Sequence, residues 1–217
     1  MKKNVLLLTI ALVIFAFTTN AQQNNAFYGI QAGTNYAWYT PRFLNPNTED
    51  IRYAGKVGLY IGGFVNFKMS DKLRIQPSLL FAAQGSKFIN ENVEVRQNSN
   101  DPATEFDFKF NIIESTIVLP VVVQNYLSEK FFIEAGPQVG YIFSLKDKSV
   151  GDTLPGTQND GTGNLSNNDK LDLGLLVGLG YKLNENFGLN SRYYFGVIER
   201  NNGLKSSVVN LGIEYSF

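Results

Sequence analysis

The 217-residue sequence contains no cysteine and no histidine. Without cysteine the chain has no disulfides, no thiolate metal ligands and no thiol nucleophile. Without histidine it lacks the usual general base of serine and cysteine hydrolases and the commonest metal-binding side chain. These absences exclude the main hydrolase and metal-centre classes, so we expect a non-enzymatic protein with no cofactor and no metal.

Charge is scarce and balanced. Only 18% of the residues are charged, whereas about 25% are charged in a typical soluble globular chain. Lysine and arginine together number 19, and so do aspartate and glutamate, so the formal net charge is zero. A chain without net positive charge has no long-range field that attracts nucleic acid, and we expect no nucleic-acid partner.

Residues 1–21 are typical of a secretory signal peptide. Two lysines near the N-terminus precede an uncharged apolar stretch at residues 5–17, and small residues precede the cleavage point. The apolar stretch is shorter than the roughly 20 residues that a helix needs to cross a bilayer. We therefore predict cleavage between Ala21 and Gln22, which leaves residues 22–217 as one exported domain. The cleavage point has no cysteine, so no lipid anchor is expected.

Beyond the signal peptide, apolar side chains recur at every second position, which is the pattern of a β-strand with two unlike faces. The clearest example is the last segment, where a row ending in Tyr215 and Phe217 alternates with polar residues and glycine. The pattern predicts eight strands, at residues 26–38, 55–68, 73–87, 106–126, 131–144, 169–183, 187–199 and 205–217. Within 106–126 the apolar residues change parity near Glu114 and Ser115, which predicts a β-bulge there.

The predicted connections alternate in length. Short turns fall at 69–72, 127–130 and 184–186, and long polar loops fall at 39–54, 88–105 and 145–168, with a shorter loop near 200–204. Outer-membrane barrels have short periplasmic turns and longer extracellular loops. The sequence therefore predicts an all-β protein, an eight-stranded antiparallel up-and-down transmembrane β-barrel in the outer membrane, with lipid around it.

The distribution of polar residues separates this barrel from an exported, lipocalin-like barrel, which has an apolar interior and binds an apolar ligand. Here one face of the strands collects polar residues and glycines, and aromatic residues gather near the strand ends, as in membrane barrels. We expect Arg74, Glu134, Arg192 and Glu214 to form an interior charge cluster, because buried charges need partners. Eight strands leave an interior just wide enough for side chains. A small passive pore and the lipocalin-like barrel remain as alternatives.

The last eight residues resemble the C-terminal insertion signal of outer-membrane barrels, polar-x-Gly-x-x-aromatic-x-Phe. The matching positions are Asn210, Gly212, Tyr215 and Phe217. This resemblance implies delivery to the barrel assembly machinery, which reads the last strand.

Most of the chain resembles the PorT-type outer-membrane β-barrel family. The matching stretches are LRIQPSLLF at 73–81 with Gly85, LPVVV at 119–123, FIEAGPQVGY at 132–141, GLLVGLGY at 174–181, and Arg192-Tyr193 with Gly196. One departure is Val118, where a carboxylate is usual, with Glu114 four residues earlier. The resemblance implies a structural or interaction barrel without catalytic residues. Some members are linked to protein secretion across the outer membrane, which implies a secretion-system or periplasmic protein as partner.

Overall fold

The computed structural model describes residues 26–41, 51–96, 102–150, 161–162, 170–200 and 203–217. The predicted signal peptide and its cleavage point at Ala21 and Gln22 lie outside these residues. The strands are β1 (Ala26–Thr40), β2 (Ile51–Lys68), β3 (Leu73–Val95), β4 (Thr104–Tyr126), β5 (Phe131–Ser149), β6 (Gly161–Thr162), β7 (Leu171–Lys182), β8 (Phe187–Gly196) and β9 (Lys205–Ser216). None of the described ranges contains a helix long and apolar enough to span a bilayer.

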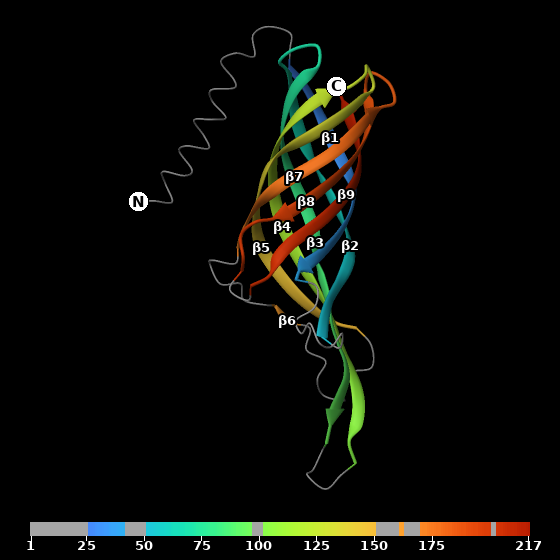
Figure 1. Cartoon of the computed structure of the whole chain (residues 1–217), viewed down its shortest axis with the longest axis vertical. Helices are drawn as coiled ribbons and strands as arrows, with labels where there is room; N and C mark the ends of the chain where they lie inside the picture. The colour runs from blue at the N-terminus through green and yellow to red at the C-terminus, as the bar shows by residue number, and fades with distance from the viewer. Residues whose placement is uncertain (1–25, 42–50, 97–101, 151–160, 163–169, 201–202) are drawn as a thin grey trace, which may run out of the picture.

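The strands close into an antiparallel barrel (Figure 1). Each strand pairs with its neighbours along the chain, and the last strand, β9, pairs with β1 over twelve residue pairs from Gly29↔Ser216 to Thr40↔Lys205. Strand β6 has only two residues and adds to β5 at Lys146 and Asp147, so the other eight strands make the ring. Closure gives the backbone amides at the two edges of the sheet hydrogen-bond partners, which lipid cannot supply. The predicted eight-stranded up-and-down barrel is confirmed.

Three short turns lie at one end of the barrel, together with the C-terminus (Figure 1, top). In two of them a serine hydroxyl accepts a hydrogen bond from the residue that starts the next strand, Ser70 from the Leu73 amide and Ser128 from the Phe131 amide, both at 3.1 Å. In the third, Asn184 Oδ1 accepts from the amides of Asn186 and Phe187. Side chains of this kind replace missing backbone partners, so each turn is closed by its own sequence.

At the opposite end, β3 and β4 continue beyond their neighbours as a two-stranded hairpin (Figure 1, bottom). Pairing of β2 with β3 stops at Asn90, and pairing of β4 with β5 stops at Phe110, but β3 and β4 pair on to Val95 and Thr104. Most of this hairpin occupies residues that the sequence assigned to the loop at 88–105. We call residues 91–95 and 104–109 the projecting hairpin.

The expected bulge belongs to a different strand. In the pairing of β4 with β5, Ser115 faces Ser144 and Thr116 faces Ile142, so the extra residue is Phe143 of β5. Strand β4 keeps one parity through this point, with Glu114 and Thr116 both buried. The alternate apolar residues of β4 before Glu114 therefore have the same inward-facing parity as Glu114, near the long-loop end of the barrel. The change of face occurs in β5 instead.

Apolar side chains cover the outside of the barrel and polar side chains fill it. Leu175 on β7 is 47% exposed, whereas its neighbour Leu176 is 1% exposed. The buried polar side chains come from every strand of the ring; they include Gln31, Gln76, Gln84, Glu114, Gln124, Glu134, Gln138, Asp172, Asn190, Arg192 and Glu214. A lipocalin-like barrel requires the reverse arrangement, so that alternative is wrong for this chain.

Candidate functional site

The centre of the lumen holds a buried charge cluster formed by Arg192 of β8, Glu134 of β5 and Glu214 of β9. Arg192 Nε lies 2.5 Å from Glu134 Oε1, and Nη2 lies 2.9 Å from Glu214 Oε1. The third guanidinium nitrogen, Nη1, donates to Gln31 Oε1 at 2.7 Å. One cation therefore joins two carboxylates and an amide from three other strands. Three of the four residues predicted for the interior cluster lie together here.

A glycine makes the contact between Arg192 and Glu134 geometrically feasible. Gly178 of β7 faces Glu134 on one side and Arg192 on the other in the strand register. A Cβ atom at this position would lie 3.0 Å from Glu134 Oε1 and 3.0 Å from Arg192 Cγ. The missing side chain leaves the space through which the guanidinium reaches across β7.

Neutral amides complete the central network. Gln76 and Asn190 each donate to Glu214 Oε1 at 3.0 Å, and Gln124 donates to Glu134 Oε2 at 3.1 Å. Asn66 in turn donates to Gln124 Oε1 at 2.8 Å. These donors are needed because two carboxylates share one guanidinium, and a buried charge without hydrogen bonds is costly. The lumen at this level is a connected polar plug.

Arg74 does not join this cluster, which corrects the sequence-based expectation. It lies near the start of β3, where its guanidinium carbon is 4.6 Å from the centre of the Tyr126 ring and 5.7 Å from that of Phe27. No described carboxylate forms an ion pair with it, and its buried Nε has no hydrogen-bond partner in the described part of the chain. Two residues of strand place Arg74 about 7 Å nearer the turns than Gln76, whose side chain reaches Glu214.

A second charge cluster lies between the plug and the long loops. Glu114 of β4 accepts hydrogen bonds from Arg200 Nη1 and from the Tyr39 hydroxyl of β1, each at 2.5 Å. Arg200 Nη2 also donates to Ser206 of β9 at 2.9 Å, and nearby the Tyr194 hydroxyl donates to Asp172 at 2.7 Å. The sequence pointed to Glu114 only at the expected bulge and as the carboxylate four residues before the departure at Val118. Arg200 was missed because it follows β8 and was assigned to a loop.

The four residues of the predicted insertion signal lie on β9 or directly after it. Asn210 and Gly212 have the inward parity, and Tyr215 and Phe217 the outward one. Phe217 is 73% exposed, its amide donates to the Tyr28 carbonyl at 2.9 Å, and its ring packs edge-on against Tyr215 at 5.4 Å. Gly212 has a packing role as well, because a Cβ atom there would collide with the Tyr60 hydroxyl.

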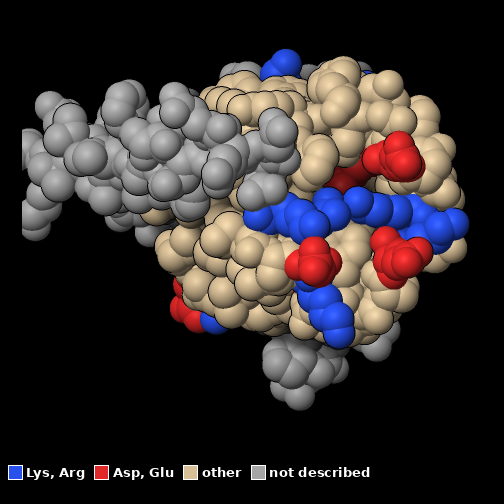
Figure 2. Space-filling view, turned by 90° about the horizontal axis from the view of Figure 1, so that it is seen from above, with Lys and Arg blue, Asp and Glu red and all other residues tan. Residues whose placement is uncertain are grey.

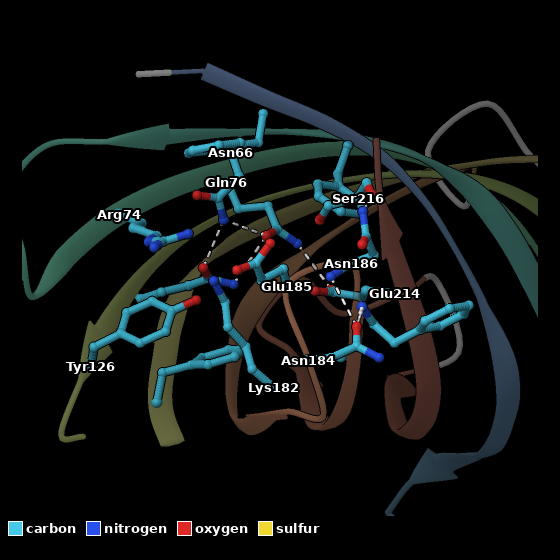
Figure 3. Close-up of a pocket in the computed structure, with 16 residues that line it drawn as sticks. Asn66, Arg74, Gln76, Tyr126, Lys182, Asn184, Glu185, Asn186, Glu214 and Ser216 are labelled. Carbon is cyan, nitrogen blue, oxygen red and sulfur yellow. Dashed lines mark hydrogen bonds between the residues drawn. The ribbon is translucent and has the colours of Figure 1, made fainter. Parts of the chain in front are cut away.

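The lumen opens at the short-turn end into a cavity of about 270 Å³. We call it the mouth cavity. Figure 3 shows Arg74 and Lys182 beside the Tyr126 ring, with Asn184, Asn186 and Ser216 across from them. Figure 2 views the same end and shows basic side chains in a band across the mouth, with acidic side chains beside it. Glu214 lines the floor, so the mouth cavity connects directly to the polar plug.

The described residues do not provide a metal site, since no group of three acidic side chains among them could hold a metal ion. Glu134 and Glu214, the two carboxylates of the interior cluster, could act as acid and base only if they were free, and both are held by Arg192 and by amide donors. These contacts stabilise the buried charges inside a closed barrel. Side chains that a solute or a partner protein can reach lie at the two ends of the barrel.

Several solved structures are similar to this chain. Neisserial surface protein A has 16% identity over 89% of this chain and 100% of its own, with a TM-score of 0.48. Ail, the attachment invasion locus protein of Yersinia pestis, has 10% identity over 90% of this chain and 100% of its own, with a TM-score of 0.45. OprG from Pseudomonas aeruginosa has 14% identity over 89% of this chain and 96% of its own, with a TM-score of 0.38.

No curated protein matches the chain. The family model for the outer membrane protein beta-barrel domain matches residues 20–199. This match covers most of the sequence and agrees with the closed barrel, its apolar outer surface and its polar lumen. The chain belongs to the outer membrane protein β-barrel domain family, and its location is the outer membrane.

Proposed function

We propose that this barrel is a non-enzymatic structural or interaction protein that works through its two ends. The observation that carries the proposal is the filled lumen. Arg192 with Glu134 and Glu214 crosses it at one level, and Arg200 with Glu114 crosses it at another. Barrels with aqueous channels have about 16 strands, whereas eight strands leave room only for side chains.

The chemistry of the chain also favours a non-enzymatic role. The sequence has no histidine and no cysteine, so the usual proton shuttle and thiol nucleophile are missing. A general acid–base pair needs carboxylates that are free to exchange protons with a substrate. Here Glu134 and Glu214 share the guanidinium of Arg192 inside the plug.

The more specific proposal is an accessory role in protein secretion across the outer membrane. It is supported by the resemblance of residues 73–81, 119–123, 132–141 and 174–181 to the PorT-type family. The partner in this proposal is a secretion-system or periplasmic protein that contacts the short-turn end. The projecting hairpin offers a second contact surface, since β3 and β4 extend there beyond their neighbours.

Bilayer conductance tests the filled lumen against the alternative of a small passive pore. The purified full-length barrel is reconstituted in planar bilayers, with an open porin of about 16 strands as the positive control. We expect no steady unitary currents from this chain. Reproducible unitary currents at constant voltage would show that the lumen conducts and would overturn the structural role.

A deletion strain tests the secretion role. We expect proteins that normally leave the cell to accumulate in the periplasm, while other outer-membrane barrels assemble normally. A photo-crosslinking residue at Lys130, in an exposed short turn, is expected to capture a partner protein in native membranes. The same residue at Leu175 on the outer wall is the control, and we expect no such product there. Normal secretion in the deletion strain would contradict the accessory role.

A further inference from the structure

Two basic side chains, those of Arg74 and Lys182, line the mouth cavity. Arg74 comes from the start of β3 and Lys182 from the end of β7, and both lie over the same ring, Tyr126. The Lys182 ammonium is 5.3 Å from the ring centre. Neither residue forms an ion pair with a described carboxylate, although acidic residues line the same cavity. Two neighbouring cations repel each other, so their position in one cavity without an ion-paired carboxylate among the described residues needs a physical explanation.

Arg74 is held in a fixed orientation by aromatic contacts. Its guanidinium contacts the rings of both Tyr126 and Phe27, which orients the group at little conformational cost. Its Nε is buried and has no hydrogen-bond acceptor among the described residues. A buried donor that lacks an acceptor is unfavourable, so an oxygen ligand at this point would satisfy it.

The acidic residues of the cavity form no described ion pair with these cations, although Glu214 acts on Lys182 through space. Glu214 Oε1 already accepts hydrogen bonds from Gln76, Asn190 and Arg192. Glu185 is exposed in the turn at 183–186, where salt weakens its field. The plug below contains two carboxylates and one guanidinium, an excess of one negative charge, and the mouth cavity above it adds two cations.

The other polar groups of the mouth cavity are suitable donors. The Asn184 side chain is fixed because its Oδ1 accepts hydrogen bonds from two backbone amides of its own turn. Its Nδ2 group is left as a donor at the cavity (Figure 3). The cavity volume of about 270 Å³ is below the usual range of about 300–1,000 Å³ for drug-sized ligands. It suits one small group.

We infer that the mouth cavity binds a single oxyanion group, a carboxylate or a phosphate, between Arg74 and Lys182. The guanidinium donates in a fork that matches two oxygens, and the ammonium adds a point charge. The ligand enters from the short-turn end, which faces the periplasm in outer-membrane barrels. This inference goes beyond the proposed function and does not depend on it, because it concerns the mouth cavity and neither the plug nor the projecting hairpin.

The test is a titration of the full-length barrel in zwitterionic nanodiscs, followed by NMR of the Tyr126 ring and the Lys182 side chain. The probes are inorganic phosphate, acetate, and a short peptide with acetylated and amidated ends and one central aspartate, with the asparagine peptide, blocked in the same way, as its control. We expect saturable shifts at Tyr126 with the anions and none with the asparagine peptide. Tightest binding of phosphate or acetate would identify a free solute as the source of the oxyanion. Tightest binding of the aspartate peptide would identify an acidic protein side chain as the source. Nanodiscs with anionic lipid add a third source, since a bound headgroup would compete with phosphate.

Variants separate this site from general surface charge. Arg74→Gln and Lys182→Gln are each expected to weaken phosphate binding about tenfold or more, which corresponds to about 1.4 kcal/mol. Arg74→Lys keeps the charge and is expected to recover part of the affinity. Lys130→Gln, in an exposed turn outside the cavity lining, is expected to change the affinity less than about twofold. Heat-modifiable gel mobility confirms that each variant is folded.

Two results would overturn the inference. One is the absence of saturable shifts at Tyr126 in the wild-type barrel with any of the anions. The other is an equal loss of affinity in Lys130→Gln and Arg74→Gln, which would assign binding to the general charge of the rim.

Discussion

Arg192 on β8 reaches past β7 to Glu134 on β5, so that its Nε lies 2.5 Å from Glu134 Oε1 although the two strands do not pair with each other. The contact ties β5 to β8 over the inner face of β7. This contact adds to the backbone hydrogen bonds between neighbouring strands. It is formed by the side chains of Arg192 and Glu134, which are only 3% and 0% exposed. The stability of the barrel is therefore expected to depend on a few interior residues.

Arg192→Met is expected to lower the free energy of unfolding by about 3–5 kcal/mol, because it leaves two carboxylates buried without their cation. Urea unfolding from lipid vesicles measures the change. Adding Glu134→Gln is expected to recover part of the loss, because one buried charge is removed. Arg52→Met, at a partly exposed ion pair near the base of the projecting hairpin, is the control and is expected to shift the midpoint much less. Equal midpoints for Arg192→Met and wild type would contradict a stabilising plug.

Gly178→Ala tests the space that the plug requires. The added Cβ would lie 2.8 Å from the Ser191 carbonyl oxygen and 3.0 Å from both Glu134 Oε1 and Arg192 Cγ, and crowding of this kind costs about 1–3 kcal/mol. Gly188→Ala is the matched control, because the nearest atom to its added Cβ is the Tyr181 carbonyl oxygen at 3.7 Å. The same urea measurement compares them. Equal urea midpoints for the two alanine variants would show that Arg192 reaches Glu134 across β7 without needing the space at Gly178.

Leu175→Arg places a charge on the outer wall of β7. A lipid-facing arginine near the membrane midplane costs about 2–4 kcal/mol, and one near the interface costs about 0–1 kcal/mol. Leu183→Arg, in the turn after β7 and similarly exposed, is therefore expected to be much milder. Folding yield in lipid vesicles and urea midpoints both report the difference. Similar midpoints for the two variants would place Leu175 away from the hydrocarbon core.

Deletion of Phe217 tests the insertion signal. The residue ends the chain with an exposed ring packed on Tyr215, so its removal leaves the seam of β1 and β9 intact up to Ser216. We expect export across the inner membrane to continue and assembly in the outer membrane to fail. Fractionation and heat-modifiable gel mobility measure the two steps. Normal abundance of a heat-modifiable barrel without Phe217 would rule out the signal.

Acid is expected to loosen the projecting hairpin. Hydrogen bonding from Arg52 holds the pKa of Glu91 below its usual range, and Lys109 does the same for Asp107. Carboxyl groups with lowered pKa values stabilise the fold above their unfolded pKa values of about 4, and this stabilisation is lost as the pH falls through the folded values. NMR contacts across the pair Asn90↔Phe108 are expected at neutral pH and weaker near pH 3. The pair Leu179↔Ser191 in the ring is the control and should not change. Contacts at Asn90 that persist unchanged in acid would show that the ion pairs are not required.

The period-two pattern of the sequence predicted the strands, their order and their two faces. That pattern is local, because neighbouring residues of a strand point to opposite faces whatever the rest of the chain does. The alternation holds even at Leu175 and Leu176, two adjacent leucines that the structure places on the outer wall and inside the barrel, respectively. Part of the projecting hairpin was missed, since residues 91–95 and 104–105 resemble a loop when their pairing partner is unknown.

The sequence by itself determined that this chain is an outer-membrane β-barrel with a polar interior, because alternation, turn length and composition are properties of short segments. Only the tertiary structure decided the partners inside. Strand tilt and register set which side chains reach the same height in the lumen. They bring Arg192 to Glu134 through the gap at Gly178, bring Arg200 to Glu114, and leave Arg74 at the mouth cavity beside Lys182.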